Sequence, residues 1–261
     1  MSRVNLNEEQ GEAVTMSATA FVPGPALATM PSLAEPSRIQ RVFWAASVAC
    51  AASLLGTLAV NLLRTVDWWQ WWVPVALLAG VALADFSSGL VHWAADTWGR
   101  ADLPLIGPRI LVPFRVHHVN PDDFLRRRFL DTNGDVAALA IPALLAILWI
   151  PLDGTPGQGL ALAGWGFCAM GVMTNQIHQW AHMPVPPRVV AFLQAAGLLL
   201  RPHDHKRHHG LPYDGEYCIT TGWWNRPLDA IAFFRRLEYA VTRVTGAQPR
   251  HDEQHDGALN A

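Results

Sequence analysis

Charged residues are scarce in this chain: they make up 15 % of its 261 positions, whereas a soluble domain usually carries about 25 %. Hydrophobic residues make up 51 %, and this imbalance favours one membrane-embedded domain over two soluble ones. Lysine is nearly absent: only one of the 19 basic residues, Lys206, is a lysine. The formal net charge is only −2, so nothing indicates a nucleic-acid partner.

Cysteine is also rare. Cys50, Cys168 and Cys218 are too few and too scattered for a disulfide framework or a CxxC metal site. The first 37 residues are rich in Ala, Pro, Ser and Thr and lack a basic segment followed by an apolar core, so a cleaved signal peptide is not expected. We expect residues 1–37 and 245–261 to be disordered cytosolic tails, the second of which contains His251 and His255.

Four apolar stretches are long enough to be considered as membrane spans. The first has 22 residues without a charge, which as a helix crosses a hydrocarbon core of about 30 Å. The links after the first and third stretches are short, so the sequence predicts an all-α integral membrane protein with four transmembrane helices in two hairpins. The stretches are Val42–Leu63, Trp71–Ala94, Val136–Leu152 and Leu160–Ala181.

Basic residues predict the orientation of these spans. The segment 95–135 carries six arginines, including the run Arg126–Arg128, whereas the link 153–159 has no basic residue. By the positive-inside rule, both termini and the long middle loop should be cytosolic. A fifth apolar run, Val189–Leu200, has only 12 residues; it is too short to span and predicts an interfacial or re-entrant segment.

Histidines from four distant segments fall on the same predicted membrane face. HWAAD and HQWAH each place two candidate ligands four residues apart, on one face of a helix. HKRHH offers three histidines at helical spacing, whereas the neighbouring His203 is outside that register. The candidate ligands are His92, Asp96, His117, His118, His178, His182, His205, His208 and His209.

Nine candidate ligands are too many for one four-coordinate metal and suit two metals with open positions. Imidazole binds zinc, copper, iron and nickel, so the spacing does not identify the metal. A pair of metals beside lipid chains suits O₂-dependent oxidation of a lipid, as a desaturase or a hydroxylase. A metal sensor or transporter is the non-enzymatic alternative, although transporters place their ligands near the bilayer midplane.

Four segments resemble the Kua-type lipid desaturase family, which includes plasmanylethanolamine desaturases and a plastid phosphatidylglycerol desaturase. They are GLVHWAADTWG, FRVHHVNPDDFLRRRFLDTNGD, NQIHQWAHMP and HKRHHGLPYDGEYCITTGWWN. The resemblance covers about residues 40–238 and implies a membrane desaturase domain at 38–244. It also implies that all nine candidate residues bind a di-iron centre, which uses O₂ and electrons from a small carrier such as cytochrome b5 or ferredoxin.

One position departs from the histidine boxes of acyl desaturases. Position 114 is Phe where the HxxHH box of those enzymes begins, so Asp96 or a water would complete the ligand set. We expect a membrane ether phospholipid as substrate, with the enzyme in the bacterial inner membrane or its equivalent. The alternatives are an acyl desaturase that forms a trans double bond near the carboxyl end and a lipid hydroxylase.

Overall fold

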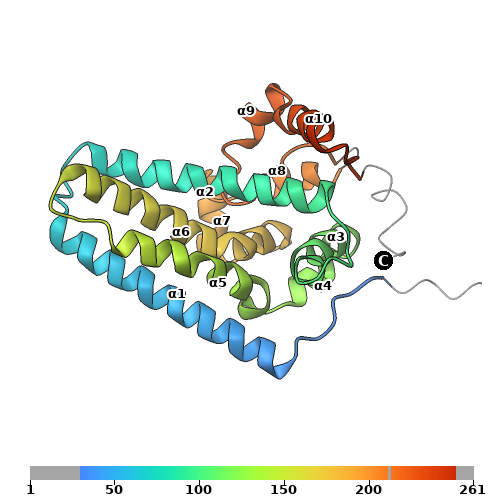
Figure 1. Cartoon of the computed structure of the whole chain (residues 1–261), viewed down its shortest axis with the longest axis horizontal. Coiled ribbons are helices and arrows are strands. Elements are labelled where there is room, and N and C mark those ends of the chain that lie inside the picture. Colours follow the sequence, from blue (N-terminus) through green and yellow to red (C-terminus); the bar gives the residue numbers. More distant parts are fainter. Residues whose placement is uncertain (1–29, 211–212, 251–261) are drawn as a thin grey trace, which may run out of the picture.

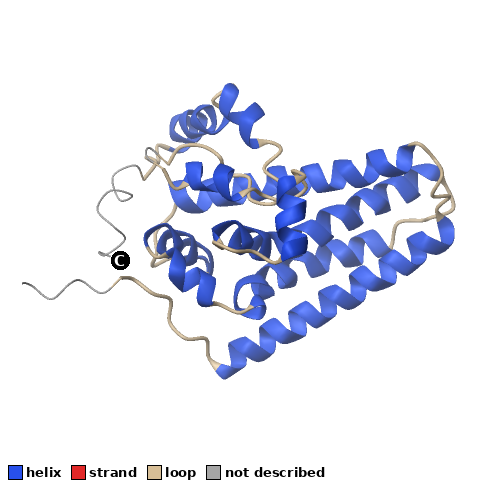
Figure 2. Cartoon of the chain, turned by 180° about the vertical axis from the view of Figure 1, so that it is seen from behind, coloured by secondary structure: helices blue, strands red, loops and turns tan. Residues whose placement is uncertain are grey.

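The computed structural model describes residues 30–210 and 213–250, and these residues form helices and loops without a strand (Figure 2). The prediction of an all-α protein is therefore confirmed for this part of the chain. The four long helices are α1 (Arg38–Thr65), α2 (Trp72–Thr97), α5 (Phe129–Leu148) and α6 (Thr155–His182). The short ones are α3 (Val112–Val119), α4 (Pro121–Arg126), α7 (Arg188–Ala195), α8 (Pro202–His208), α9 (Asn225–Ala230) and α10 (Phe233–Thr245), and a π-helical turn, η1 (Gly107–Leu111), precedes α3.

The long helices lie side by side in the order α1, α5, α6, α2 (Figure 1). Their shared core includes Leu58 and Leu62 of α1, Leu144 of α5 and Leu162 of α6, each at most 1 % exposed. The contact between α2 and α6 is especially close, because a Cβ atom at Gly80 would collide with the backbone carbonyl of Ala163. A small residue at such a contact lets two helix backbones approach one another, as is common in membrane bundles.

Three of the described helices, α1, α2 and α5, are long and apolar enough to cross a membrane. The fourth expected span corresponds to α6, which has 28 residues but is not among these three. Its last two turns contain Asn175, Gln176 and Gln179 beside two histidines, and these polar residues lower its mean hydropathy. The prediction of four spans is thus met for three helices.

The expected pairing of consecutive helices is met by α5 and α6, which pack together. It is not met by α1 and α2, because α5 and α6 lie between them (Figure 1). A short link brings two helix ends together but does not determine which helices share a face. The interfacial run expected at Val189–Leu200 contains the short helix α7, and Val189 and Phe192 of this helix are about 70 % exposed.

The short helices α3, α4 and α8 gather at one end of the long ones, where α2 and α6 also end (Figure 1). Helix α10 contributes Phe234 to a separate buried cluster with Trp93 of α2 and Tyr217. The described part of the expected N-terminal tail also lies at this end of the molecule. There Asn120 donates to the carbonyl of Pro31 at 3.0 Å, and Arg127 donates to that of Leu33 at 2.6 Å. His251 and His255 lie outside the described residues.

Candidate metal centre

All nine candidate residues come together at the end of the bundle, in two groups whose ligand atoms lie within 4.8 Å of one another. Cluster A consists of His117, His178, His182, His205 and His209. Cluster B consists of His92, Asp96, His118 and His208. Helix α2 supplies only cluster B and α6 only cluster A, whereas α3 and the α8 segment contribute to both.

Cluster A is built around the Nε2 atom of His205. This atom lies 2.8 Å from His178 Nε2, 2.8 Å from His182 Nε2 and 3.1 Å from His209 Nε2. An imidazole nitrogen carries one hydrogen or one lone pair, so these three approaches cannot all be hydrogen bonds. The buried Nε2 of His117 has no hydrogen-bond partner. Five ring nitrogens that point at one space are the arrangement that a bound cation stabilises.

Cluster B is built around one carboxylate oxygen. Oδ2 of Asp96 lies 3.2 Å from Nε2 of His92, 3.2 Å from that of His118 and 3.5 Å from that of His208. The approach of His92 has the distance of an ion pair but not the geometry of a hydrogen bond, because this Nε2 has no hydrogen-bond partner. Asp96 thus lies among the three imidazoles of cluster B, within reach of a cation that they could share.

The spacing of these atoms fits metal ligation. When imidazole nitrogens lie about 2.0–2.1 Å from a metal such as zinc, neighbouring ligand atoms are roughly 3 Å apart. The nitrogen–nitrogen distances from His205 in cluster A and the shortest nitrogen–oxygen distances in cluster B lie between 2.8 and 3.2 Å. Both clusters thus have the donor set and the spacing that a first-row transition metal needs.

Backbone carbonyls orient two of the cluster B imidazoles. His92 Nδ1 lies 3.1 Å from the carbonyl of Tyr217, and His208 Nδ1 lies 2.8 Å from that of Gly215. A carbonyl only accepts, so both Nδ1 atoms donate and both Nε2 atoms keep their lone pairs for a metal. Such hydrogen bonds behind the ligands fix the tautomer and the ring orientation in metal sites.

The surroundings favour the neutral form of three histidines outside the long helices: His117, His205 and His209. Burial lowers the pKa of His117 and of His205 well below the usual value, and the neighbouring imidazoles lower it further. The pKa of His209 is lowered by the same two causes. Because a histidine binds metal only when neutral, these imidazoles are ready to act as ligands at pH 7.

Aromatic rings form part of the wall around the clusters. Phe114, at the position where acyl desaturases have a histidine, lies with its ring centre 4.9 Å from that of His92. Phe124 lies 5.0 Å from the ring of His178. These rings cover the imidazoles with apolar surface, and an apolar shell limits the access of water to a metal site.

Asp85 holds a loop behind cluster B, a role that the sequence did not reveal. Its Oδ1 accepts hydrogen bonds of 2.8 to 3.2 Å from the backbone N–H groups of Thr220, Thr221 and Gly222 and from the hydroxyl of Thr220. Its Oδ2 accepts from the N–H of Trp224 at 3.1 Å. This single buried carboxylate fixes the CITTGW segment on α2. Because the carbonyl of Tyr217 immediately precedes this segment, Asp85 also steadies the support of His92.

Other polar residues near the clusters support the helices. Asn133 lies inside α5, and its Oδ1 accepts from the N–H of Gln176 on α6 at 3.1 Å. Gln179 Nε2 donates to the carbonyls of Phe124 and Arg127. Asp123 is paired with Arg127 at 2.9 Å rather than with an imidazole. These contacts fix the end of α6, which carries two histidines of cluster A.

His203 stands apart from both clusters. Its side chain is 81 % exposed, and its Nδ1 faces Asp204 at 3.4 Å. This agrees with the helical register of α8, which turns His205 and His208 inward and His203 outward.

In the described residues, apolar helices long enough to cross a membrane and two histidine-rich clusters at one end of the bundle point to the class of membrane proteins with a candidate metal centre. Comparison with known proteins identifies the family. Residues 81–252 match the family described as "Lipid desaturase domain", and the chain belongs to this lipid desaturase family. Together with the three apolar helices, this membership indicates an integral membrane protein.

Several relatives align with about two thirds or more of this chain. It is 39 % identical over 216 residues to "Plasmanylethanolamine desaturase" of Myxococcus xanthus, covering 80 % of this chain and 74 % of the relative. It is 39 % identical over 219 residues to "Plasmanylethanolamine desaturase 1" of Mus musculus, covering 80 % of each. "Fatty acid desaturase 4, chloroplastic" of Arabidopsis thaliana is 37 % identical over 66 % of this chain and 52 % of the relative. No solved structure matches.

Proposed function

We propose that this protein converts a 1-O-alkyl phosphoethanolamine lipid into the corresponding vinyl ether, a plasmalogen. Two relatives named plasmanylethanolamine desaturase, each 39 % identical to this chain, support this substrate. The single structural observation that carries the proposal is the pairing of clusters A and B at the end of the bundle. The reaction removes one hydrogen from each of the first two carbons of the ether chain and forms a double bond between them.

Two iron ions are the cofactors of this proposal. Cluster A would hold one iron and cluster B the other, with all nine candidate residues as ligands. The pair of irons supplies the activation of O₂ that the removal of hydrogen from an unactivated C–H bond requires. The balance is complete when two hydrogens from the lipid, two electrons and two protons reduce O₂ to two waters. A small carrier such as cytochrome b5 or ferredoxin would supply the electrons.

The protein's own residues orient the site and exclude water. The carbonyls of Gly215 and Tyr217 hold the rings of His208 and His92 at a fixed angle. Phe114 and Phe124 cover the imidazoles, and an apolar wall of this kind also suits the alkyl chain of a lipid. Orientation and a dry site are the contributions that a protein makes to metal-based oxidation.

The membrane topology belongs to the same proposal. Helices α1, α2, α5 and α6 would all cross the bilayer, with both termini and the two clusters on the cytosolic side. Arg100, Arg109, Arg115 and Arg126–Arg128 lie between α2 and α5, at the end of the bundle that holds the clusters. Their concentration there supports a cytosolic orientation.

The test is to express the chain in cells that lack plasmalogens and to feed them an alkyl lysolipid. We expect vinyl ether lipids, which release an aldehyde in mild acid, detected by mass spectrometry. A matched His208→Ala variant should be inserted in the membrane but produce none. Membrane-inserted wild-type protein that leaves the alkyl lipid unchanged would contradict the proposal.

A second candidate is supported by the plant relatives. The chain is 37 % identical to "Fatty acid desaturase 4, chloroplastic", which favours an acyl desaturase that forms a trans double bond near the carboxyl end. The same lipid profile separates the two candidates, because an unsaturated acyl chain does not release an aldehyde in mild acid.

A further inference from the structure

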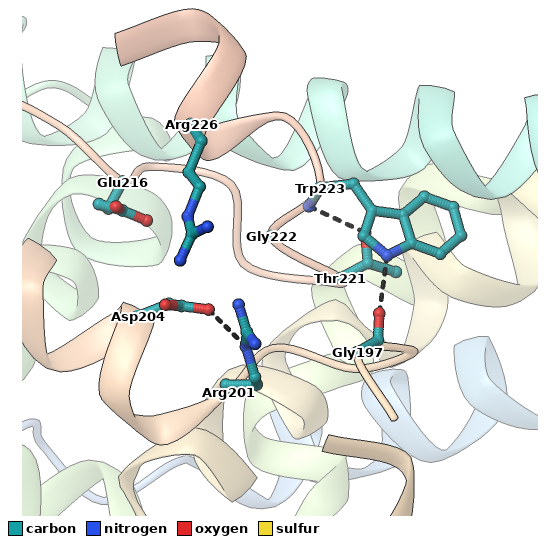
Figure 3. Close-up of a pocket in the computed structure, with 8 residues that line it drawn as sticks. All are labelled: Gly197, Arg201, Asp204, Glu216, Thr221, Gly222, Trp223 and Arg226. Atoms are coloured by element: carbon teal, nitrogen blue, oxygen red, sulfur yellow. Dashed lines mark hydrogen bonds and ion pairs between the residues drawn. The ribbon is translucent and has the colours of Figure 1, made fainter. Parts of the chain in front are cut away.

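A small charged cavity lies between α8 and the loop that follows it, outside both clusters. Its volume is about 190 Å³, and Arg201, Asp204, Glu216, Trp223 and Arg226 are among the residues that line it (Figure 3). Small-molecule pockets usually measure about 300–1,000 Å³. The cavity is therefore the size of a compact polar group rather than of a whole lipid.

Two guanidinium groups and two carboxylates surround this space. In Figure 3, the side chains of Arg201 and Arg226 enter it from opposite sides, with Asp204 and Glu216 beside them. Arg201 Nε donates to Asp204 Oδ2 at 2.7 Å. The wall thus offers both signs of charge within one cavity, which complements a group that carries both a phosphate and an ammonium ion.

Glu216 is the most informative member of this wall. It is only 4 % exposed, and its Oε1 accepts no hydrogen bond although Nη1 of Arg207 lies 2.9 Å away. Arg207 thus pairs with this buried carboxylate oxygen without the geometry of a hydrogen bond, and a buried acceptor without a well-directed donor is costly. A ligand that brings a positively charged N–H donor into the cavity would supply a well-directed hydrogen bond.

The cavity and cluster B share one backbone segment. The carbonyls of Gly215 and Tyr217 accept from His208 and His92, while Glu216 between them lines the cavity. Glu216 has a φ of +58°, in the left-handed region that is unfavourable for a residue with a Cβ. This strained residue separates the cavity from cluster B, so a group bound in the cavity lies next to the proposed metal site.

Apolar surface adjoins the cavity. Trp223 is 36 % exposed and its Nε1 donates to the carbonyl of Gly197 at 2.7 Å. On α7 and the link from α7 to α8, Val189, Phe192 and Leu198 are 70 %, 69 % and 48 % exposed. An exposed apolar patch beside a polar cavity and a tryptophan is typical of a membrane interface.

We propose that this cavity binds the zwitterionic head group of the lipid substrate, with its phosphate between Arg201 and Arg226 and its ammonium ion at Glu216 and Asp204. The proposal rests on the proposed function. The head group would lie beside the segment 215–217 that supports cluster B, and the first carbons of the lipid chain would extend from there toward the metals. The cavity would thereby select phosphoethanolamine lipids and fix the position of the new double bond.

The experiment compares three alkyl ether lipids that differ only in their head groups: phosphoethanolamine, phosphocholine and phosphoglycerol. Each is supplied in vesicles to the wild-type protein and to the Glu216→Gln, Arg226→Gln and Arg243→Gln variants. Arg243 is exposed on α10, away from the cavity, and serves as the matched control. Vinyl ether formation and iron content are measured for every variant.

We expect the wild-type protein to prefer phosphoethanolamine. The Glu216→Gln variant should lose about tenfold of its preference over phosphoglycerol, the factor of one charge-assisted hydrogen bond. The Arg226→Gln variant should be slower with all three lipids, because each contains a phosphate. Both variants should retain wild-type iron content, and Arg243→Gln should behave as the wild-type protein does.

A wild-type protein without head-group preference would overturn the assignment, as would cavity variants of normal iron content that keep wild-type rates and preference. If Glu216→Gln loses its iron, the rates of vinyl ether formation by Arg226→Gln alone test the assignment. Inhibition by millimolar inorganic phosphate that is relieved in Arg226→Gln would assign the cavity to a soluble anion and overturn the lipid proposal. If the wild-type protein forms no vinyl ether at all, it is the proposed function that fails.

Discussion

Clusters A and B lie side by side but are built differently. Cluster A has five histidines and no carboxylate, whereas cluster B has three histidines and Asp96. The rings of His92 and His208 in cluster B are held by backbone carbonyls of the segment 215–217, while His205 Nδ1 in cluster A is buried without a partner. The comparison indicates that cluster B, with its charge and its link to the charged cavity, is the more precisely positioned of the two.

The largest expected effect comes from removing one proposed ligand of either cluster. His205→Ala takes away the nitrogen around which cluster A is arranged, and His208→Ala removes a member of cluster B. Because the proposed reaction needs both metals, each variant should lose all measurable vinyl ether formation while it remains in the membrane. Lipid mass spectrometry and membrane fractionation check this. Activity retained in both variants would contradict the assignment of two cooperating metals.

Asp96→Asn tests the difference between clusters A and B, because it removes the negative charge that only cluster B has. The amide keeps an oxygen near His92 and His118 but is a poorer ligand for a cation. The purified variant should lose about half of its bound iron, since metal affinity depends on ligand charge. Iron analysis beside the wild-type protein measures this. Equal loss from both clusters would show that they do not bind metal independently.

The sequence predicted all nine members of the two clusters but not their division. His208 and His209 are adjacent, and so are His117 and His118, yet the members of each pair lie in different clusters. Spacing along a helix shows which residues share a face, but the division between two centres depends on how α3 and α8 meet α2 and α6. That is a tertiary property.

Other features could not be predicted from the sequence for the same reason. Asp85 lies within an apolar stretch, and its hydrogen-bond partners are 135 to 139 residues away in the chain. The packing of α1 against α5 could not be predicted, because the length of a loop constrains only the two helices that it connects. Glu216 gave no signal at all, since its importance depends on a backbone conformation and a cavity.

Asp85→Asn tests whether the loop behind cluster B matters to that cluster. The amide oxygen of Asn can replace Oδ1, but the NH₂ group cannot accept from the N–H of Trp224, and the hydrogen bonds to residues 220–222 lose the negative charge that strengthens them. We expect a destabilisation of about 3 kcal/mol, read as a lower thermal midpoint, and a weaker affinity for iron. A variant with normal stability and normal iron content would show that the loop is held by other contacts.

The smallest effect concerns the bundle away from the clusters. Gly80→Ala would force α2 and α6 apart, because the new Cβ meets the carbonyl of Ala163, whereas Gly56→Ala on α1 meets nothing within 4 Å. The first change should destabilise the protein by roughly 1–3 kcal/mol, and the second should be neutral or slightly stabilising. Thermal unfolding in detergent compares the pair. Equal midpoints would contradict the close contact of α2 with α6.

The most direct test of the account is anomalous X-ray scattering at the iron edge from crystals of the purified protein. The account predicts two separate peaks, one among the imidazoles of cluster A and one between Asp96 and the histidines of cluster B. A single peak, peaks elsewhere in the molecule, or no iron signal in active protein would contradict it.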